Sequence, residues 1–364
     1  MDVQVQLLNI DCLGKPLRLE ASLAGWQAVY WDNALVAQCP ASADNQGQRS
    51  HQFQLQSGEQ TLTITLKIDL NWQPFSLSYQ LYAQDKLVTE GQRNQHDIEQ
   101  QTPVVAPVKV SQLSLVGLAS LGFKLLKSAK VIKVVLAGAS IAAYSWLFSF
   151  QFALALIACL VFHEYGHIRA MKYFGMKTKG IYLIPFMGGL ALSDEKINTR
   201  WQDVVISIMG PTFGLLMSLL SLVAYWITGN IFFAGLASFN ALLNLFNLLP
   251  ILPLDGGHIL KSISFSMNSI VGLAACVIGA AIGVYISYSL GLALLGFLLL
   301  IGSVEIVFEW RSRHHSHLLP LDRYGQVFSA IWYLLTVGAL IAIIWYFASS
   351  GDDILALPLK ILSS

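Results

Sequence analysis

Hydrophobic and polar positions follow two different periods along this chain. In the amino-terminal part, apolar residues alternate with polar ones, most clearly in TLTITLKIDL, where Leu62, Ile64 and Leu66 point one way. Such period-two runs, separated by short polar turns, predict β-strands with one buried face. We therefore expect residues 1–100 to form a soluble all-β domain, built as an antiparallel sheet or a small sandwich.

Long apolar stretches dominate the remainder of the chain. Residues 101–131 predict a linker and an amphipathic helix at the membrane surface, because lysines recur there at helical spacing beside Leu and Phe. About seven stretches follow that each approach the roughly twenty residues needed to cross a bilayer. They cover residues 132–149, 151–174, 203–227, 231–250, 268–287, 289–308 and 327–348. The pattern predicts a polytopic α-helical membrane protein, with its membrane domain over 132–348 and a tail over 349–364.

Basic residues gather in one set of the loops between these stretches. Arg169 and Lys172, for example, lie at the end of the second stretch, whereas the loops near Phe150, Gly229 and Ser289 carry no Lys or Arg. The positive-inside rule therefore places the amino terminus in the cytoplasm. The first residues show no basic region followed by an apolar stretch, so we expect no cleavable signal.

Composition agrees with this division. The chain is 55% hydrophobic and 12% charged, with a net charge of +1 that says less than the uneven placement of the charges. Its four cysteines form no close-spaced zinc or redox pattern, and the sequence indicates no disulfide framework. We expect the lipid bilayer as a partner and no nucleic acid, and we leave the oligomeric state open.

Titratable residues interrupt the second apolar stretch in the segment LVFHEYGHIRAM. His163, Glu164 and His167 form the pattern H-E-x-x-H. On a helix, positions i and i+4 share a face, so both imidazoles can reach one zinc ion while Glu164 flanks its open coordination position. Ionisable groups inside a membrane span are costly and by default functional. The pattern predicts a zinc hydrolase with its metal inside the bilayer.

A catalytic zinc site normally has three protein ligands and a water, so one ligand is missing from this pattern. The candidate is Asp255, in NLFNLLPILPLDGGH at the end of the fourth stretch. Pro250 and Pro253 break the helix there, and Gly256-Gly257 permits unusual backbone angles. We expect Asp255 to lie on irregular backbone at membrane depth, which is tolerated only inside protein or beside a wet cavity.

The segment KGIYLIPFMGGLALSDE lies between the second and third stretches. It is too apolar for a free loop and too short to span a bilayer, and it predicts a membrane-associated β-hairpin over residues 178–195. An unpaired edge of such a hairpin could accept an unwound substrate segment as an added strand. The alternative is a hairpin that only plugs the cavity.

Together these motifs resemble those of the site-2 protease family of intramembrane zinc metalloproteases. The HEYGH helix, the Gly-containing hairpin and N-x-x-P-x-x-P-L-D-G-G follow in the same order, over roughly residues 130–265. The resemblance also covers Met209-Gly210-Pro211, where Gly210 and Gly214 would let helices pack closely. It does not extend to the β domain, and the chain has no recognisable PDZ insertion. The site residues that the resemblance implies are His163, His167 and Asp255 as ligands of one catalytic Zn²⁺, Glu164 as the base, and Asn247 near the reacting peptide.

The resemblance implies a zinc metalloendopeptidase that hydrolyses a peptide bond within or near a transmembrane segment of another protein. Zinc would activate a water, and Glu164 would act as general base. The implied substrate is a transmembrane protein, for example a membrane-bound regulator of the anti-sigma-factor kind, and the implied location is a bacterial inner membrane.

Two alternatives remain open. A membrane zinc protease of a different family would take its third ligand from a Glu in a later helix. A non-proteolytic membrane scaffold that retains a zinc site would usually close it with four protein ligands. The sequence names neither the substrate nor its cleavage site, and it assigns no role to the β domain.

Overall fold

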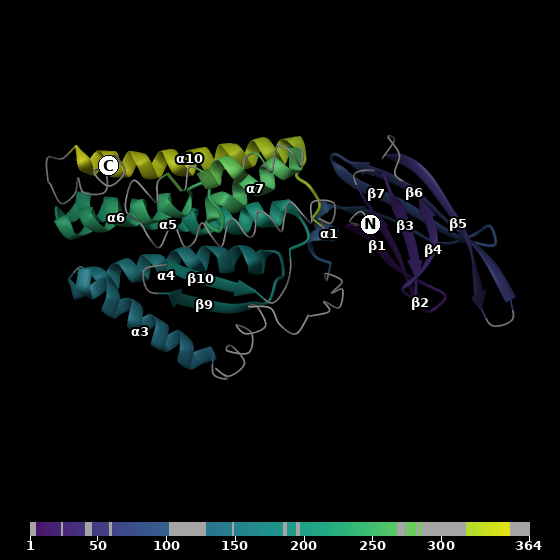
Figure 1. Cartoon of the computed structure of the whole chain (residues 1–364), viewed down its shortest axis with the longest axis horizontal. Coiled ribbons are helices and arrows are strands. Elements are labelled where there is room, and N and C mark those ends of the chain that lie inside the picture. The colour runs from purple at the N-terminus through teal and green to yellow at the C-terminus, as the bar shows by residue number, and fades with distance from the viewer. Residues whose placement is uncertain are drawn as a thin grey trace.

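The computed structural model divides into a β domain at one end and a group of helices at the other (Figure 1). The residues that it describes are 5–22, 25–40, 46–57, 60–101, 129–147, 149–184, 188–193, 197–267, 274, 276–281, 284–285 and 318–349.

The β domain contains two four-stranded antiparallel sheets, as the alternating pattern predicts. The first sheet has the order β1 (Val5–Cys12), β2 (Lys15–Ala21), β3 (Gln27–Trp31) and β4 (Ala34–Cys39). The second has the order β5 (Gly47–Ser57), β6 (Gln60–Trp72), β7 (Phe75–Ala83) and β8 (Lys86–Asn94). Neighbouring strands are consecutive in the chain, so both sheets are simple meanders.

Two tight turns show how local sequence sets the strand register. Asp32 and Asn33 join β3 to β4, and Gln84 and Asp85 join β7 to β8, all with positive φ. Two-residue hairpin turns with positive φ at both positions match the right-handed twist of the flanking strands, and Asn and Asp tolerate that conformation better than most residues.

The apolar faces of the two sheets bury a common core. Leu7 and Leu17 from the first sheet and Leu66 and Leu77 from the second are fully buried in it. His51 is also buried, and its Nε2 lies 2.8 Å from Gln27 Oε1. Burial, with a smaller contribution from nearby Arg49, lowers the pKa of His51 to about 4, so the ring is neutral inside the sandwich.

The helical part contains three helices that are long and apolar enough to cross a membrane and two shorter apolar ones among the described residues. The long helices are α4 (Phe150–Tyr173), α5 (Arg200–Thr228) and α10 (Arg323–Ala348); the shorter apolar segments are Ile132–Trp146 in α3 (Ala129–Leu147), and α6 (Ile231–Asn247). These match the predicted stretches one to four and the last. The predicted stretch 289–308 lies outside the described residues, and within 268–287 the structure describes only residues 274, 276–281 and 284–285.

Helix ends follow from capping residues in the sequence. The Thr199 side chain accepts from the backbone N–H of Gln202, and the Gln202 side chain accepts from that of Thr199, which forms a capping box at the start of α5. Gly229 ends α5 with φ of 65°. A left-handed residue at this point favours glycine, and Asn230 then caps α6.

A two-stranded hairpin, β9 (Thr178–Ile184) and β10 (Gly188–Ser193), lies beside α3 and α4 (Figure 1). Lys133 of α3 holds it, because its Nζ donates to the Lys179 carbonyl at 2.5 Å and lies 4.8 Å from the centre of the Tyr182 ring. The predicted hairpin therefore exists as an antiparallel pair within residues 178–193.

The β domain is joined to the membrane helices through its last residues. The short helix α1 (Gln95–Glu99) follows β8, and Gln202 Nε2 donates to the Glu99 carbonyl at 3.0 Å. Asn198 Nδ2 donates to the Gln101 carbonyl at 2.7 Å. Leu319, just before α10, is buried in the β-domain core and forms a β-bridge with Thr199.

Candidate metal centre

The two sequence motifs meet at one buried point between helices. His163, Glu164 and His167 lie on one stretch of α4 and are 3%, 4% and 8% exposed. Asp255 is the first residue of α7 (Asp255–Met267), and its carboxylate faces them. The spacing in the sequence had therefore identified residues from two distant elements that the fold brings together.

The three predicted ligands fit a tetrahedral metal ion. His163 Nε2 lies 3.1 Å from His167 Nε2, and Asp255 Oδ2 lies 3.4 Å and 3.6 Å from these two atoms. Tetrahedral ligands at about 2.0–2.2 Å from one zinc ion lie about 3.3–3.6 Å from each other. Both distances to Asp255 fall in this range, and the distance between the two histidine nitrogens is slightly shorter. Among the described residues, these three also form the only cluster of His, Cys, Asp and Glu that could hold a metal ion. Two neutral imidazoles and a carboxylate suit Zn²⁺ chemically.

Glu164 lies beside the ligand atoms without belonging to the set. Its Oε1 is 3.9 Å from His163 Nε2. A buried carboxylate at that distance can hold a proton next to a metal-bound substrate or water without occupying a coordination position. The arrangement fits the predicted role of a general base.

Glycines on α5 make room for the site. A Cβ at Gly210 would collide with the rings of His163 and His167, and a Cβ at Gly166 of α4 would collide with the Met209 carbonyl. A Cβ at Gly214 would collide with the side chain of Asn244. Small residues let helix backbones approach closely in a membrane protein. The predicted close packing at Gly210 and Gly214 is thus present, and it opens the space that the imidazoles occupy.

The second ring nitrogen of each histidine also has a partner. His167 Nδ1 lies 2.7 Å from the Ile206 carbonyl, and His163 Nδ1 lies 2.7 Å from Asn244 Oδ1. Metal-binding histidines usually donate their other N–H to such an acceptor, which orients the ring. Both rings therefore present Nε2 toward Asp255.

Asn244 is a site residue that sequence reasoning missed. The prediction named Asn247, which lies three residues later on α6 and is partly exposed; no hydrogen bond in the described part of the chain joins it to the cluster. The available signal was the pair Asn240 and Asn244, which lie at positions i and i+4 in an otherwise apolar span. Polar residues at that spacing mark one face of a membrane helix as facing protein.

The region around Asp255 differs from expectation in its backbone. The helix does break between α6 and α7, as Pro250 and Pro253 predict. Asp255 nevertheless begins a regular helix, and Gly256 and Gly257 are helical rather than unusual in their angles. Their Cβ atoms would collide with the backbone of Leu248 to Leu252, so the glycines serve close approach of two chain segments.

A second polar group fixes α7 against α5. Ser262 Oγ donates to Asp203 Oδ2 at 2.5 Å, and His258 Nδ1 lies 3.5 Å from Asp203 Oδ1. Asp203 lies in the first turn of α5 and is buried. His258 therefore contacts Asp203 and does not belong to the metal cluster.

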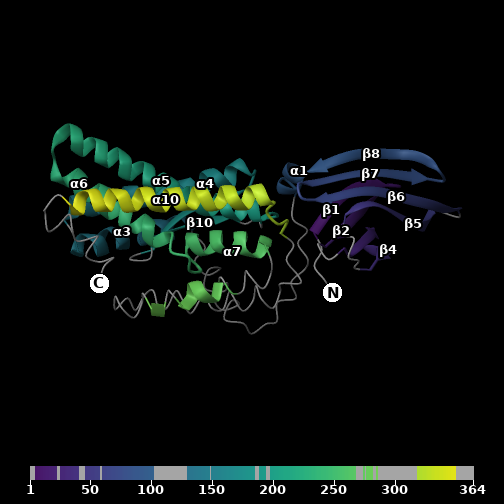
Figure 2. The ribbon, with the colours of Figure 1, turned by 90° about the horizontal axis from the view of Figure 1, so that it is seen from above.

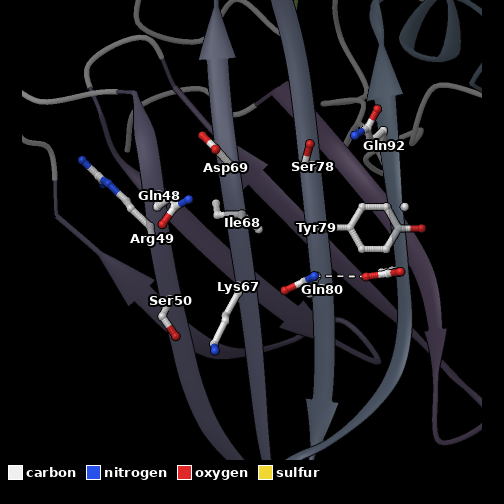
Figure 3. A pocket seen from close by; sticks show the side chains of 12 residues that line it. Gln48, Arg49, Ser50, Lys67, Ile68, Asp69, Ser78, Tyr79, Gln80 and Gln92 are labelled. Carbon is white, nitrogen blue, oxygen red and sulfur yellow. Dashed lines mark hydrogen bonds between the residues drawn. The ribbon is translucent and has the colours of Figure 1, made fainter.

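The β domain carries a separate polar hollow of about 850 Å³ on the second sheet, shown in Figure 3. Side chains of both charges line it, including Lys67 and Asp69 on β6, and Gln80 donates to Glu90 at 3.0 Å across β7 and β8. None of the metal-cluster residues lines this hollow. The buried cluster between the helices is therefore the candidate active site.

The sequence of the helical part matches a known family. The model of peptidase family M50 aligns with residues 151–231 and 227–294. These ranges contain the three residues of the cluster and Glu164. This match favours the site-2 protease family over a membrane zinc protease of a different family.

Several relatives are similar over the same part of the chain. A Synechocystis protein, described as a candidate zinc metalloprotease, is 39% identical over 128 residues, which are 34% of this chain and 34% of the relative. A zinc metalloprotease of Methanocaldococcus jannaschii is 33% identical over 135 residues, which are 36% of this chain and 39% of the relative. Stage IV sporulation protein FB of Bacillus subtilis is 26% identical over 188 residues, which are 47% of this chain and 63% of the relative.

The chain therefore spans less than two thirds of the length of each of these relatives. The similarity lies in the apolar helical part, so the chain is an integral membrane protein, and zinc is the metal for which the relatives are named. Over residues 151–294, which include the cluster of His163, His167 and Asp255, this chain matches peptidase family M50, the site-2 protease family.

Proposed function

We propose that this protein is an intramembrane zinc metalloendopeptidase that cuts a peptide bond within or near a transmembrane segment of another membrane protein. The observation that carries the proposal is the buried set of three ligand atoms at 3.1–3.6 Å from one another, with the Glu164 carboxylate beside them. A scaffold with a purely structural metal would need neither an open coordination position nor this carboxylate.

The chemistry follows from the groups at the site. His163, His167 and Asp255 would hold the zinc ion, which when bound supplies Lewis-acid activation of a water and of the peptide carbonyl. Glu164 takes the proton that the attacking water gives up and passes it to the leaving nitrogen, so that water is added across the broken bond. The buried position of Glu164 keeps bulk water from competing for that proton.

Two further elements take part in the proposed reaction. Asn247 would lie near the scissile peptide, as the family resemblance implies, and its partial exposure at the end of α6 supports this role because a substrate segment could reach it. The edge of the β9–β10 hairpin holds the substrate backbone as an added strand. A transmembrane helix keeps its backbone groups paired internally, so an unwound segment needs such partners in a low-dielectric site.

The proposed architecture is a membrane domain of seven spans over residues 132–348, with a cytoplasmic β domain over residues 1–100. The linker at 101–131 and the tail at 349–364 flank the membrane domain. Basic loop residues gather on the side that carries the β domain, which by the positive-inside rule is the cytoplasmic side. The proposed location is a bacterial inner membrane, and the proposed substrate is a membrane protein such as a membrane-bound regulator.

Substitution of Glu164 by Gln tests the proposal. The amide occupies the space of the carboxylate but cannot accept a proton, so zinc content should stay near wild type while cleavage falls about 100- to 10,000-fold. The measurement combines metal analysis of the purified protein with substrate trapping by the Glu164→Gln variant, followed by a cleavage assay on the trapped protein.

Two other variants complete the test. His163→Ala should lose both zinc and cleavage, whereas Tyr165→Phe, on an exposed position of the same helix, should keep both. Near-normal cleavage by Glu164→Gln would remove this residue from the mechanism. A wild-type protein that binds no zinc would contradict the proposal as a whole.

A further inference from the structure

A chain of buried amides connects the metal cluster to the backbone of α5. Asn244 Oδ1 lies 2.7 Å from His163 Nδ1, and Asn244 Nδ2 donates to the carbonyl and Oδ1 of Asn240 at 2.8 Å and 3.1 Å. Asn240 Nδ2 in turn donates to the Gly214 carbonyl and to Ser218 Oγ, both at 2.8 Å. The two asparagines are 1% and 2% exposed, so water does not compete for these bonds.

The donor and the acceptor of each hydrogen bond in this series of amides can be assigned by starting from the carbonyl of Gly214. The carbonyls of Gly214 and Asn240 can only accept, so each of them must face an NH₂ group. Asn240 therefore turns its Oδ1 toward Asn244, and Asn244 turns its Oδ1 toward the ring of His163. An amide oxygen can only accept, so the proton of the neutral imidazole must lie on Nδ1.

We propose that Asn244, supported by Asn240, is a positioning residue that fixes His163 in the tautomer with a free electron pair on Nε2. This inference rests on the proposed metal site, where only the unprotonated nitrogen can bind zinc. In a low-dielectric interior the opposite tautomer would set two electron pairs against each other at Asn244, so the amide chain selects the binding form before the metal arrives.

The geometry explains why this device needs two residues. Gly214 gives Asn244 its space, since a Cβ there would collide with the amide. Asn240 then blocks the rotation of Asn244 that would exchange its oxygen and nitrogen. His167 needs no such arrangement, because its Nδ1 meets the Ile206 carbonyl directly.

The test measures zinc affinity by chelator competition in detergent, together with the absorption spectrum of the cobalt-substituted protein. Asn244→Leu, which has the same branching and the same number of side-chain heavy atoms but cannot accept a hydrogen bond, should bind zinc about 10- to 100-fold more weakly and change the cobalt bands. Asn244→Asp keeps an acceptor for the Nδ1 proton and should stay within about tenfold of wild type. Asn240→Ala should lose less than Asn244→Leu, because the carbonyl of residue 240 still orients Asn244.

Ser238→Ala is the matched control, because Ser238 is fully buried on the same helix and its hydroxyl has no hydrogen-bond partner among the described residues. Equal zinc affinity in wild type, Asn244→Leu and Ser238→Ala would overturn the inference while leaving the metal site intact. If Asn244→Leu does not fold, the comparison of Asn240→Ala with Ser238→Ala decides, and equal affinities again overturn it. These affinities are measured apart from cleavage, so a failure of the proposed protease activity is recognised separately.

Discussion

His163 and His167 differ in what holds their second ring nitrogen. A backbone carbonyl, that of Ile206, faces His167, whereas a side chain, that of Asn244, faces His163. A backbone partner persists through any substitution that keeps the helix, but a side-chain partner can be removed by one. We therefore expect zinc binding by His163, unlike that by His167, to depend on a neighbouring side chain.

The proposed ligands could be predicted from the sequence, because H-E-x-x-H and P-L-D-G-G are short patterns that each lie on one local element. The position of Asn244 at the site could not be predicted from the sequence in the same way. Asn244 and Asn247 are one turn apart, and the rotation of α6 about its own axis decides which of them faces α4. That rotation depends on packing at Gly214, which lies on a different helix.

Asp255 and His258 lie one turn apart on α7, and the structure separates their roles. Asp255→Ala should lower zinc affinity more than about 100-fold, because it removes a ligand rather than a supporting residue. His258→Ala should change it less than about tenfold, since His258 contacts Asp203. Zinc titration of both purified variants measures this difference, and the reverse order would reassign the third ligand.

At the scale of elements, α5 organises the site although it supplies no ligand. One face of this helix carries Asp203, the Ile206 carbonyl, Gly210 and Gly214, at successive spacings of three or four residues. Asp203 binds α7, and the Ile206 carbonyl orients His167. Gly210 leaves space for both imidazoles, and Gly214 leaves space for Asn244. The sequence indicated the Gly-Pro element of this helix, but the role of Asp203 depends on α7 lying beside it, which no local pattern predicts.

The hairpin gives a prediction that belongs to this scale. Successive residues of a strand point their N–H groups to opposite sides, so one of Leu190 and Ala191 faces β9 and the other faces away. Proline removes the N–H. We expect one of Leu190→Pro and Ala191→Pro to disturb the hairpin, and the other to keep zinc and fold while slowing cleavage of a fixed transmembrane substrate about tenfold.

Zinc content and cleavage rate, measured on both proline variants, distinguish a binding edge from a plug. Both substituted positions lie in β10, within the described residues. If every folded, zinc-loaded proline variant cuts at the wild-type rate, the helices hold the substrate and the hairpin only fills the cavity.

At the scale of the molecule, the β domain lies against the end of the membrane part where α5 and α10 begin (Figure 2). The sequence predicted both parts from the change of hydrophobic period. It could not predict how they meet, because the joint consists of Asn198, Gln202 and Leu319, residues that have no local pattern in common. Contacts across such a distance in sequence exist only once both parts have folded.

The proposed orientation can be tested with exposed residues at opposite ends of the molecule. In a background without native cysteines, Gln54→Cys on the β domain should be protected from a membrane-impermeant thiol reagent in intact cells. Asn230→Cys, between α5 and α6, should react, because the positive-inside rule places that loop outside. Both positions are exposed. Labelling of Gln54→Cys in unbroken cells would invert the topology, whereas labelling of both only after lysis would leave Asn230 on the inside.

The hydrogen bonds that join the helices to the β domain are accepted by main-chain atoms of the β domain. Gln202 and Asn198 donate to the main-chain carbonyls of Glu99 and Gln101, and among the described residues they donate to no side chain of the β domain. These two hydrogen bonds depend on the position of the main chain at residues 99–101 rather than on its side chains, whereas the packing of Leu319 depends on the side chains of the β-domain core. A different amino-terminal domain that ends in a similar turn could form the same two hydrogen bonds with these helices, provided that its core also accommodates Leu319.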